Sequence, residues 1–174
     1  MKRFGLWQLT LAVGIAACCF AAPGVWASPA SQDAAIRKLE RDWAQAFRAG
    51  NAQAIMKFYV RSKTLVVFDV IPPREYVGWN AYKKDWEGFL GSFAGPITLE
   101  MKDLAVEADG NLAYSHSIQH VAGKDKHGKR IDFTTRVTDV YRKIGGKWLI
   151  VHEHASVPVD LETGRADLQS TPAR

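Results

Sequence analysis

The chain has 174 residues, of which 47% are hydrophobic, and a formal net charge of +5 from 23 Lys and Arg against 18 Asp and Glu. That length suits a single domain with its own core, and charges of both signs are interspersed rather than gathered, so we expect no nucleic-acid partner. Both cysteines, Cys18 and Cys19, fall in the N-terminal segment. If that segment is removed, neither a disulfide nor a catalytic thiolate is available.

The first 27 residues are typical of a secretory signal peptide. Lys2 and Arg3 precede an apolar run, and the segment contains no acidic residue. The run is too short for a stable membrane span, and Val25 and Ala27, as small residues at the −3 and −1 positions, favour cleavage after Ala27. The alternative is a lipoprotein signal acylated at Cys18. Either signal predicts an exported protein, periplasmic or secreted.

Helical patterns come first in the rest of the chain. Apolar residues recur at spacings of three and four over residues 31–49, which predicts an amphipathic helix with its start capped by Ser31 or Asp33. Gly50 can end this helix in the left-handed conformation, and Asn51 can begin a short second helix.

Strand patterns dominate the remainder. A β-branched and aromatic run over 64–69 predicts a strand, and aromatic residues at helical spacing over 79–93 predict another helix. Turn signals then separate four further predicted strands at 97–107, 111–121, 131–144 and 147–157. Helices followed by an antiparallel meander are typical of an α+β fold. We therefore expect one folded domain over residues 28–160, and a polar, loosely held tail over 161–174.

The last predicted hairpin carries most of the polar chemistry. A two-residue turn at Gly145-Gly146 sets a register in which Arg136 and Glu153 are diagonal neighbours on one face. The other face then carries Asp139, His152 and His154. Periodicity does not decide which face looks inward, and one extra residue in either strand would shift the pairing.

This hairpin, TRVTDVYRKIGGKWLIVHEHASVP, resembles the C-terminal hairpin of the association domain of calcium/calmodulin-dependent protein kinase II. That domain belongs to the NTF2-like superfamily, together with SnoaL-like and ketosteroid-isomerase-like proteins. The resemblance continues upstream through LAYSHSIQH and Phe68-Asp69. It implies an NTF2-like cone, in which N-terminal helices pack on a curved antiparallel sheet with a pocket at the wide end. It also implies assembly as a homodimer or a larger homo-oligomer.

The resemblance further implies which residues face the pocket. Arg136 would point into the cavity, His116 would stand where the kinase domain has a second arginine, and Tyr82 would stand where it has a histidine. A fixed cation beside a titratable ring predicts a small ligand that is anionic or polar-aromatic. The other expected ligand contacts are Tyr114, Glu153, Asp69 and Trp86.

Catalysis and metal binding are the alternatives to simple binding. Asp69 or His116 could act as the base of a ketosteroid-isomerase-like or SnoaL-like isomerase or hydrolase, although no second acid stands out. His152 and His154 leave one face of a strand, which suits a metal pair completed by Asp139. The resemblance instead places that face outside, where family members dimerise. We therefore predict a non-catalytic binding or assembly module without metal or cofactor, and keep a purely structural oligomerisation hub as a further alternative.

Overall fold

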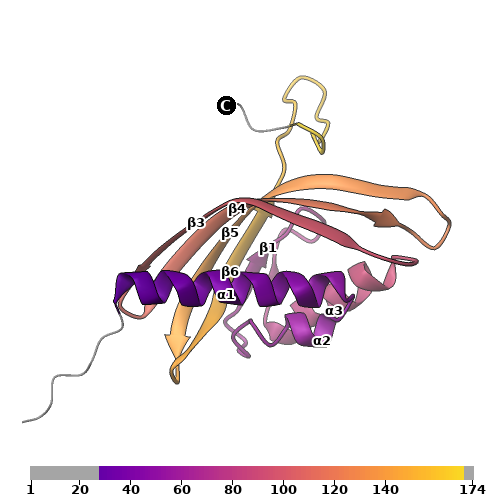
Figure 1. The fold of residues 1–174 in the computed structure, drawn as a ribbon. Helices are drawn as coiled ribbons and strands as arrows, with labels where there is room; N and C mark the ends of the chain where they lie inside the picture. Colours follow the sequence, from indigo (N-terminus) through magenta and orange to yellow (C-terminus); the bar gives the residue numbers. More distant parts are fainter. Residues whose placement is uncertain (1–27, 171–174) are drawn as a thin grey trace, which may run out of the picture.

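The computed structural model describes residues 28–170, in which helices pack against one side of a curved, six-stranded sheet (Figure 1). The helices are α1 (Pro29–Arg48), α2 (Ala52–Ile55) and α3 (Trp79–Gly91). The strands are β1 (Val66–Phe68), β2 (Tyr76–Val77), β3 (Thr98–Asp109), β4 (Leu112–Lys124), β5 (Arg130–Ile144) and β6 (Lys147–Ser156). The predicted α+β class is confirmed. The predicted signal peptide lies outside the described residues, and no helix among those described is long and apolar enough to cross a membrane.

Local signals fix both ends of α1. Ser28, rather than the predicted Ser31 or Asp33, caps its start: the Ser31 backbone N–H donates to the Ser28 Oγ at 3.3 Å. The helix therefore begins slightly earlier than its apolar spacing indicated. Gly50 follows its end with φ 63°, the left-handed conformation predicted for it. Asn51 caps α2, also as predicted.

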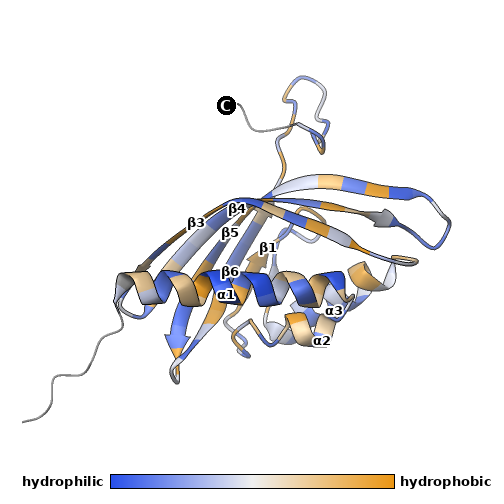
Figure 2. Ribbon diagram, viewed as in Figure 1, coloured by the Kyte–Doolittle hydropathy of each residue, from blue (hydrophilic) through white to orange (hydrophobic). Residues whose placement is uncertain are grey.

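The sheet has the strand order β2-β1-β6-β5-β4-β3. β1 runs parallel to β6, and every other neighbouring pair is antiparallel. Hydrophobic and polar residues alternate along the long strands (Figure 2), so one face of the sheet meets the helices and the other faces outward. The core between helices and sheet includes Ile36, Phe47, Val67, Tyr141 and Ile150.

The pairing of β5 with β6 changes register part of the way along the hairpin. Near the Gly-Gly turn it is as predicted, but between Val140 and Tyr141 the register shifts by one residue, because Val151 of β6 is an extra residue without a partner in β5. Beyond the shift, Asp139 pairs with Glu153, and both side chains are buried. The bulge thus places Glu153 on the same inward face as Asp139, whereas the expected register had placed these two residues on opposite faces.

Arg136 lies on the outer face, and its side chain is exposed. Its neighbour Val137 is buried, as are Asp139 and Tyr141 on the same face of β5. Because side chains of a strand alternate, Arg136 must point the other way. The predicted inward orientation of this guanidinium is wrong.

Residues 157–169, which follow β6, hydrogen-bond to one another and to β5. Val159 forms an isolated bridge with Ala166. The Thr134 N–H donates to the Leu168 carbonyl at 2.9 Å, and the Gln169 side chain donates to the Asp132 carbonyl at 2.8 Å. We call residues 157–169 the strap.

Candidate functional site

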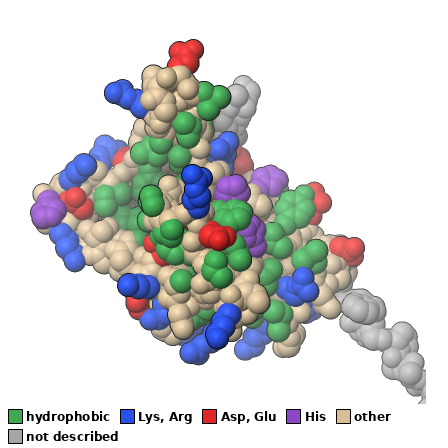
Figure 3. Space-filling view, turned by 180° about the vertical axis from the view of Figure 1, so that it is seen from behind, with side chains coloured by type: hydrophobic (Ala, Val, Ile, Leu, Met, Phe, Trp, Pro, Cys, Tyr) green, Lys and Arg blue, Asp and Glu red, His purple; other side chains and the backbone are tan. Residues whose placement is uncertain are grey.

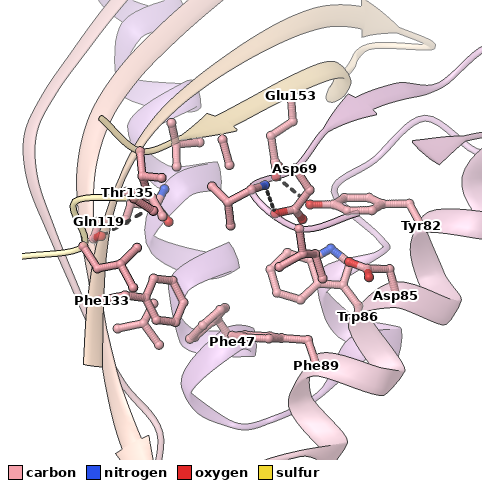
Figure 4. A pocket seen from close by; sticks show the side chains of 18 of the residues that line it. Phe47, Asp69, Tyr82, Asp85, Trp86, Phe89, Gln119, Phe133, Thr135 and Glu153 are labelled. Atoms are coloured by element: carbon pink, nitrogen blue, oxygen red, sulfur yellow. Dashed lines mark hydrogen bonds between the residues drawn. The ribbon is translucent and has the colours of Figure 1, made fainter. Parts of the chain in front are cut away.

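A cavity of about 290 Å³ lies between α1, α3, the inner face of β4, β5 and β6, and the strap (Figure 4). Its walls are mostly apolar and aromatic, and the acidic groups in its lining are the carboxyls of Asp69, Asp85 and Glu153. None of the described residues that line it is Lys, Arg or His. Such a volume with few polar groups is typical of small-molecule sites.

Trp86 is the centre of the aromatic wall. Its ring makes edge contacts with Trp43 and Phe47, at centroid distances of 5.7 Å in each case, and with Tyr82 at 5.6 Å. Only 7% of Trp86 is exposed, and its indole N–H has no hydrogen-bond partner among the described residues. A buried donor without an acceptor is costly, and because the nitrogen itself is buried, this N–H is not open to a ligand in the cavity.

Glu153 forms the polar floor of the cavity. The Tyr82 hydroxyl donates to its Oε1 at 2.6 Å, and the Tyr59 hydroxyl donates to its Oε2. The Trp43 indole in turn donates to the Tyr59 hydroxyl at 3.2 Å. Burial raises the pKa of the Glu153 carboxyl to about 7, against the lowering effect of the two tyrosine hydrogen bonds. Glu153 is thus a rigidly held acid that titrates near neutral pH.

Two more carboxyls lie behind this floor. Burial raises the pKa of Asp139 well above its usual range, and the charges of Glu153 and Glu40 add to the effect. Tyr141 donates to Glu40, and burial raises the pKa of that carboxyl to about 7. None of these three carboxyls belongs to an ion pair within residues 28–170. With no cation to stabilise their charges, the group retains protons to unusually high pH.

Asp69 and Asp85 complete the acidic side of the cavity. Asp69 directly follows β1, and the Val70 N–H donates to its Oδ1 at 2.6 Å. Burial is the main cause that raises the pKa of Asp69 to about 6, and the charge of Asp85 contributes. The Tyr76 hydroxyl donates to Asp85 Oδ1 at 2.7 Å, while burial raises the pKa of Asp85.

The structure brings four of the predicted ligand contacts together in this cavity: Asp69, Tyr82, Trp86 and Glu153. The other three, Arg136, His116 and Tyr114, are exposed and do not line it. On β4 the inward positions belong to small polar residues, Ser115 and Ser117, so Tyr114 and His116 point outward and stack at 6.5 Å. Their expected placement in the cavity is therefore wrong.

His152 and His154 lie on the outer side of the sheet, against Phe68. Their rings approach the Phe68 ring at centroid distances of 5.1 and 5.7 Å, and Figure 3 shows histidine side chains gathered among hydrophobic ones on one face. Asp139 is buried on the opposite face, so the three side chains of the metal alternative do not meet. Within residues 28–170 no group of three His, Asp or Glu is arranged to hold a metal ion.

Sequence reasoning missed Glu40 as a site residue. A charged residue in an amphipathic helix is expected on the polar side, but only 2% of Glu40 is exposed. The spacing Ile36, Glu40, Trp43, Phe47 continues the apolar stripe of α1, and this pattern could have identified it.

Comparison with solved structures identifies the fold as that of the NTF2-like superfamily. An NTF2-like protein of unknown function from Pseudomonas putida KT2440 is 33% identical, with a TM-score of 0.74 over 82% of this chain and 98% of that one. An NTF2-like superfamily protein from Salmonella enterica serovar Typhimurium LT2 is 19% identical, with a TM-score of 0.69 over 79% and 99%. A Xanthomonas campestris chain, provisionally assigned as a calcium/calmodulin-dependent protein kinase II association domain, is 24% identical, with a TM-score of 0.60 over 69% and 83%.

A comparison of the sequence with protein families assigns the chain to one family within this superfamily. The model of the SnoaL-like domain family matches residues 36–160, and the chain belongs to that family. No curated protein is significantly similar to it. The predicted superfamily and its cone of helices on a curved sheet are confirmed.

Proposed function

We propose that this protein binds a small molecule with a largely apolar body in the cavity between its helices and sheet. The observation that carries the proposal is the cavity itself, with walls of Trp43, Phe47, Trp86, Phe89 and Phe133 and with acidic groups on one side. The described lining of the cavity contains no Lys, Arg or His. We therefore no longer expect the anionic ligand that an inward Arg136 would have favoured.

Apolar burial supplies enough free energy for useful affinity. A ligand with two fused rings that buries roughly 200–300 Å² of apolar surface gains about 5–7 kcal/mol before the cost of association. The edge-to-face arrangement of the wall aromatics fixes their rings in place, so little further ordering is needed on binding. Before the cost of association that gain corresponds to a dissociation constant of roughly 10–200 micromolar, so we expect weaker binding, in roughly the high-micromolar range, for a matched ligand.

A neutral fluorescent probe, N-phenyl-1-naphthylamine, tests the proposal. Its emission should rise on binding, and Ala155→Phe, which places a ring in the cavity, should abolish the rise. His154→Phe is the matched control, because it adds the same ring one residue earlier on the outer face. Arg136→Ala should also leave binding unchanged. Equal loss in Ala155→Phe and His154→Phe, or no binding by the parent protein, would exclude the cavity as the site.

A second candidate function is proton transfer on the bound molecule, with Asp69 as the base. What favours it is that Asp69 faces the apolar cavity with a pKa raised to about 6, so at neutral pH it is ionised yet basic enough to accept a proton. His116, the other base we considered, is exposed on the outer face. Turnover of cyclic ketones that rises with pH through about 6 and is lost in Asp69→Asn would support catalysis; binding without turnover would leave a binding module.

We also propose export and self-assembly. The pattern of residues 1–27 supports export, and the mass of the protein recovered from its own source would show whether it begins at Ser28. The outer patch of Phe68, His152 and His154 supports assembly, since Phe68 is 39% exposed. Light scattering should show a dimer or larger oligomer that Phe68→Glu dissociates. An oligomer whose cavity binds no probe would instead favour the structural hub.

A further inference from the structure

We propose that the molecule bound in this cavity carries a positively charged amine, held between the aromatic wall and the acidic side formed by Asp69, Asp85 and Glu153. The inference rests on the proposed binding function and names the chemical class of the ligand. It follows from two features of the described residues: the sign of every charge in the lining and the aromatic rings beside those charges.

The charges in the lining are all acidic, and they come from three separate elements. Asp69 follows β1, Asp85 belongs to α3 and Glu153 to β6. No cation in the described lining balances them. An anionic ligand would be repelled here, and a neutral ligand would leave the carboxyls without a counter-charge. A cationic ligand supplies the charge that the buried carboxyls lack.

Aromatic rings stand next to these carboxyls. Tyr82 and Trp86 flank Asp85 by one helical turn or less on α3, and Trp43 packs edge-on against Trp86. An ammonium group is attracted to such ring faces, most strongly to Trp, and the attraction grows when water is excluded. Carboxylates together with rings therefore favour an amine over a neutral group of equal size.

No neighbouring element contributes a basic side chain to the described lining around Asp69, Asp85 and Glu153. β4 and β5 contribute the uncharged side chains of Gln119 and Thr135. Lys84 lines a separate shallow depression outside α3 that shares Asp85, and it does not line the cavity. The titratable groups near the acidic side are Tyr76, Tyr82, Tyr59, Asp139 and Glu40.

Binding of a cation should consequently be linked to proton release. The pKa of Asp69 is raised to about 6 and that of Glu153 to about 7, so both carboxyls carry protons during part of the range from pH 5 to 8. An ammonium stabilises their ionised forms and lowers these pKa values. Affinity for an amine should therefore rise from pH 5 to pH 8, whereas affinity for a neutral analogue should change little.

Three ligands with one naphthyl body test the inference by displacement of the neutral fluorescent probe: 1-naphthylmethylamine, 1-naphthylmethanol and 1-naphthoate. At pH 8 we expect the amine to bind roughly tenfold more tightly than the alcohol, and the carboxylate more weakly than both. At pH 5 the advantage of the amine should shrink. Titration calorimetry at pH 6.5 in buffers of different ionisation enthalpy should show proton release for the amine alone.

Asp69→Asn should bring the ratio of amine to alcohol affinity towards one, and Glu153→Gln should reduce it as well. Asp109→Asn, an exposed change at the end of β3, is the matched control and should keep the ratio. If the probe and the alcohol bind but the amine has no advantage at pH 8, the inference is overturned while the binding function stands. If neither the probe nor any naphthyl ligand binds, the binding function fails as well.

Discussion

Replacement of Glu153 by Gln should make the stability of the protein less dependent on pH. The side chain is buried, 5% exposed, and its two oxygens accept hydrogen bonds from Tyr82 and Tyr59. Gln keeps the shape and one acceptor oxygen, and its amide can donate to a tyrosine oxygen, so the fold should survive the change. What the substitution removes is the proton that the carboxyl binds.

The magnitude follows from the pKa of Glu153, which rises from an ordinary 4.5 to about 7 on folding. The folded protein then holds this proton more tightly than the unfolded chain. The stabilisation is complete below pH 4.5 and is lost as pH rises through 7. Between pH 5 and pH 8 this single group should cost roughly 2 to 3 kcal/mol of unfolding free energy. The Gln variant should lose that much less than the parent protein over the same range.

Urea unfolding followed by tryptophan fluorescence at pH 5, 6, 7 and 8 measures this difference. Glu162→Gln is the matched control, because that side chain is exposed in the strap, and it should follow the parent protein. The reasoning is refuted if Glu153→Gln and the parent lose the same unfolding free energy between pH 5 and pH 8.

Two further predictions concern packing and hydrogen bonding. Tyr59→Phe leaves a carboxyl oxygen of Glu153 and the indole N–H of Trp43 without their partner, so it should lower the unfolding free energy by about 1–3 kcal/mol. Tyr114→Phe, at an exposed site, is the control and should change the unfolding free energy little. Equal effects of the two substitutions would contradict this hydrogen-bond network. Gly123→Ala would bring a Cβ to 2.7 Å from the Phe93 ring and should lower the unfolding free energy by about 1–3 kcal/mol. Gly88→Ala, in helix α3, would meet no atom within 4 Å and should raise the unfolding free energy by about 0.5–1 kcal/mol. Chemical unfolding that gives both changes the same sign would refute this packing.

The elements of this fold could be predicted because their signals are local. The left-handed Gly50, the cap at Asn51 and the turn at Gly145-Gly146 each depend on a few neighbouring residues, and all three are confirmed. β2 was missed because Tyr76–Val77 is too short to show a period. The arrangement of these elements as an NTF2-like cone was predicted from the family resemblance, not from local signals.

The site could be predicted only in part, because the inward face of a strand depends on the whole sheet. Both faces of the last hairpin are half apolar, so the sequence could not show that Asp139 looks inward and Arg136 outward. The extra residue in β6 that moves Glu153 into the cavity leaves no local mark. The resemblance placed Arg136 where a relative has a pocket arginine, but it could not supply the geometry around that residue. Tyr82 and Trp86 do line the cavity, and their contact with a ligand stays a prediction.

The central claim is that an apolar ligand body lies inside this cavity. Intermolecular nuclear Overhauser effects between bound N-phenyl-1-naphthylamine and methyl-labelled protein test it most directly. We predict contacts with the methyl groups of Val121 and Val137, which line the cavity. Contacts confined to Val66 and Val140, which do not line it, would contradict the claim.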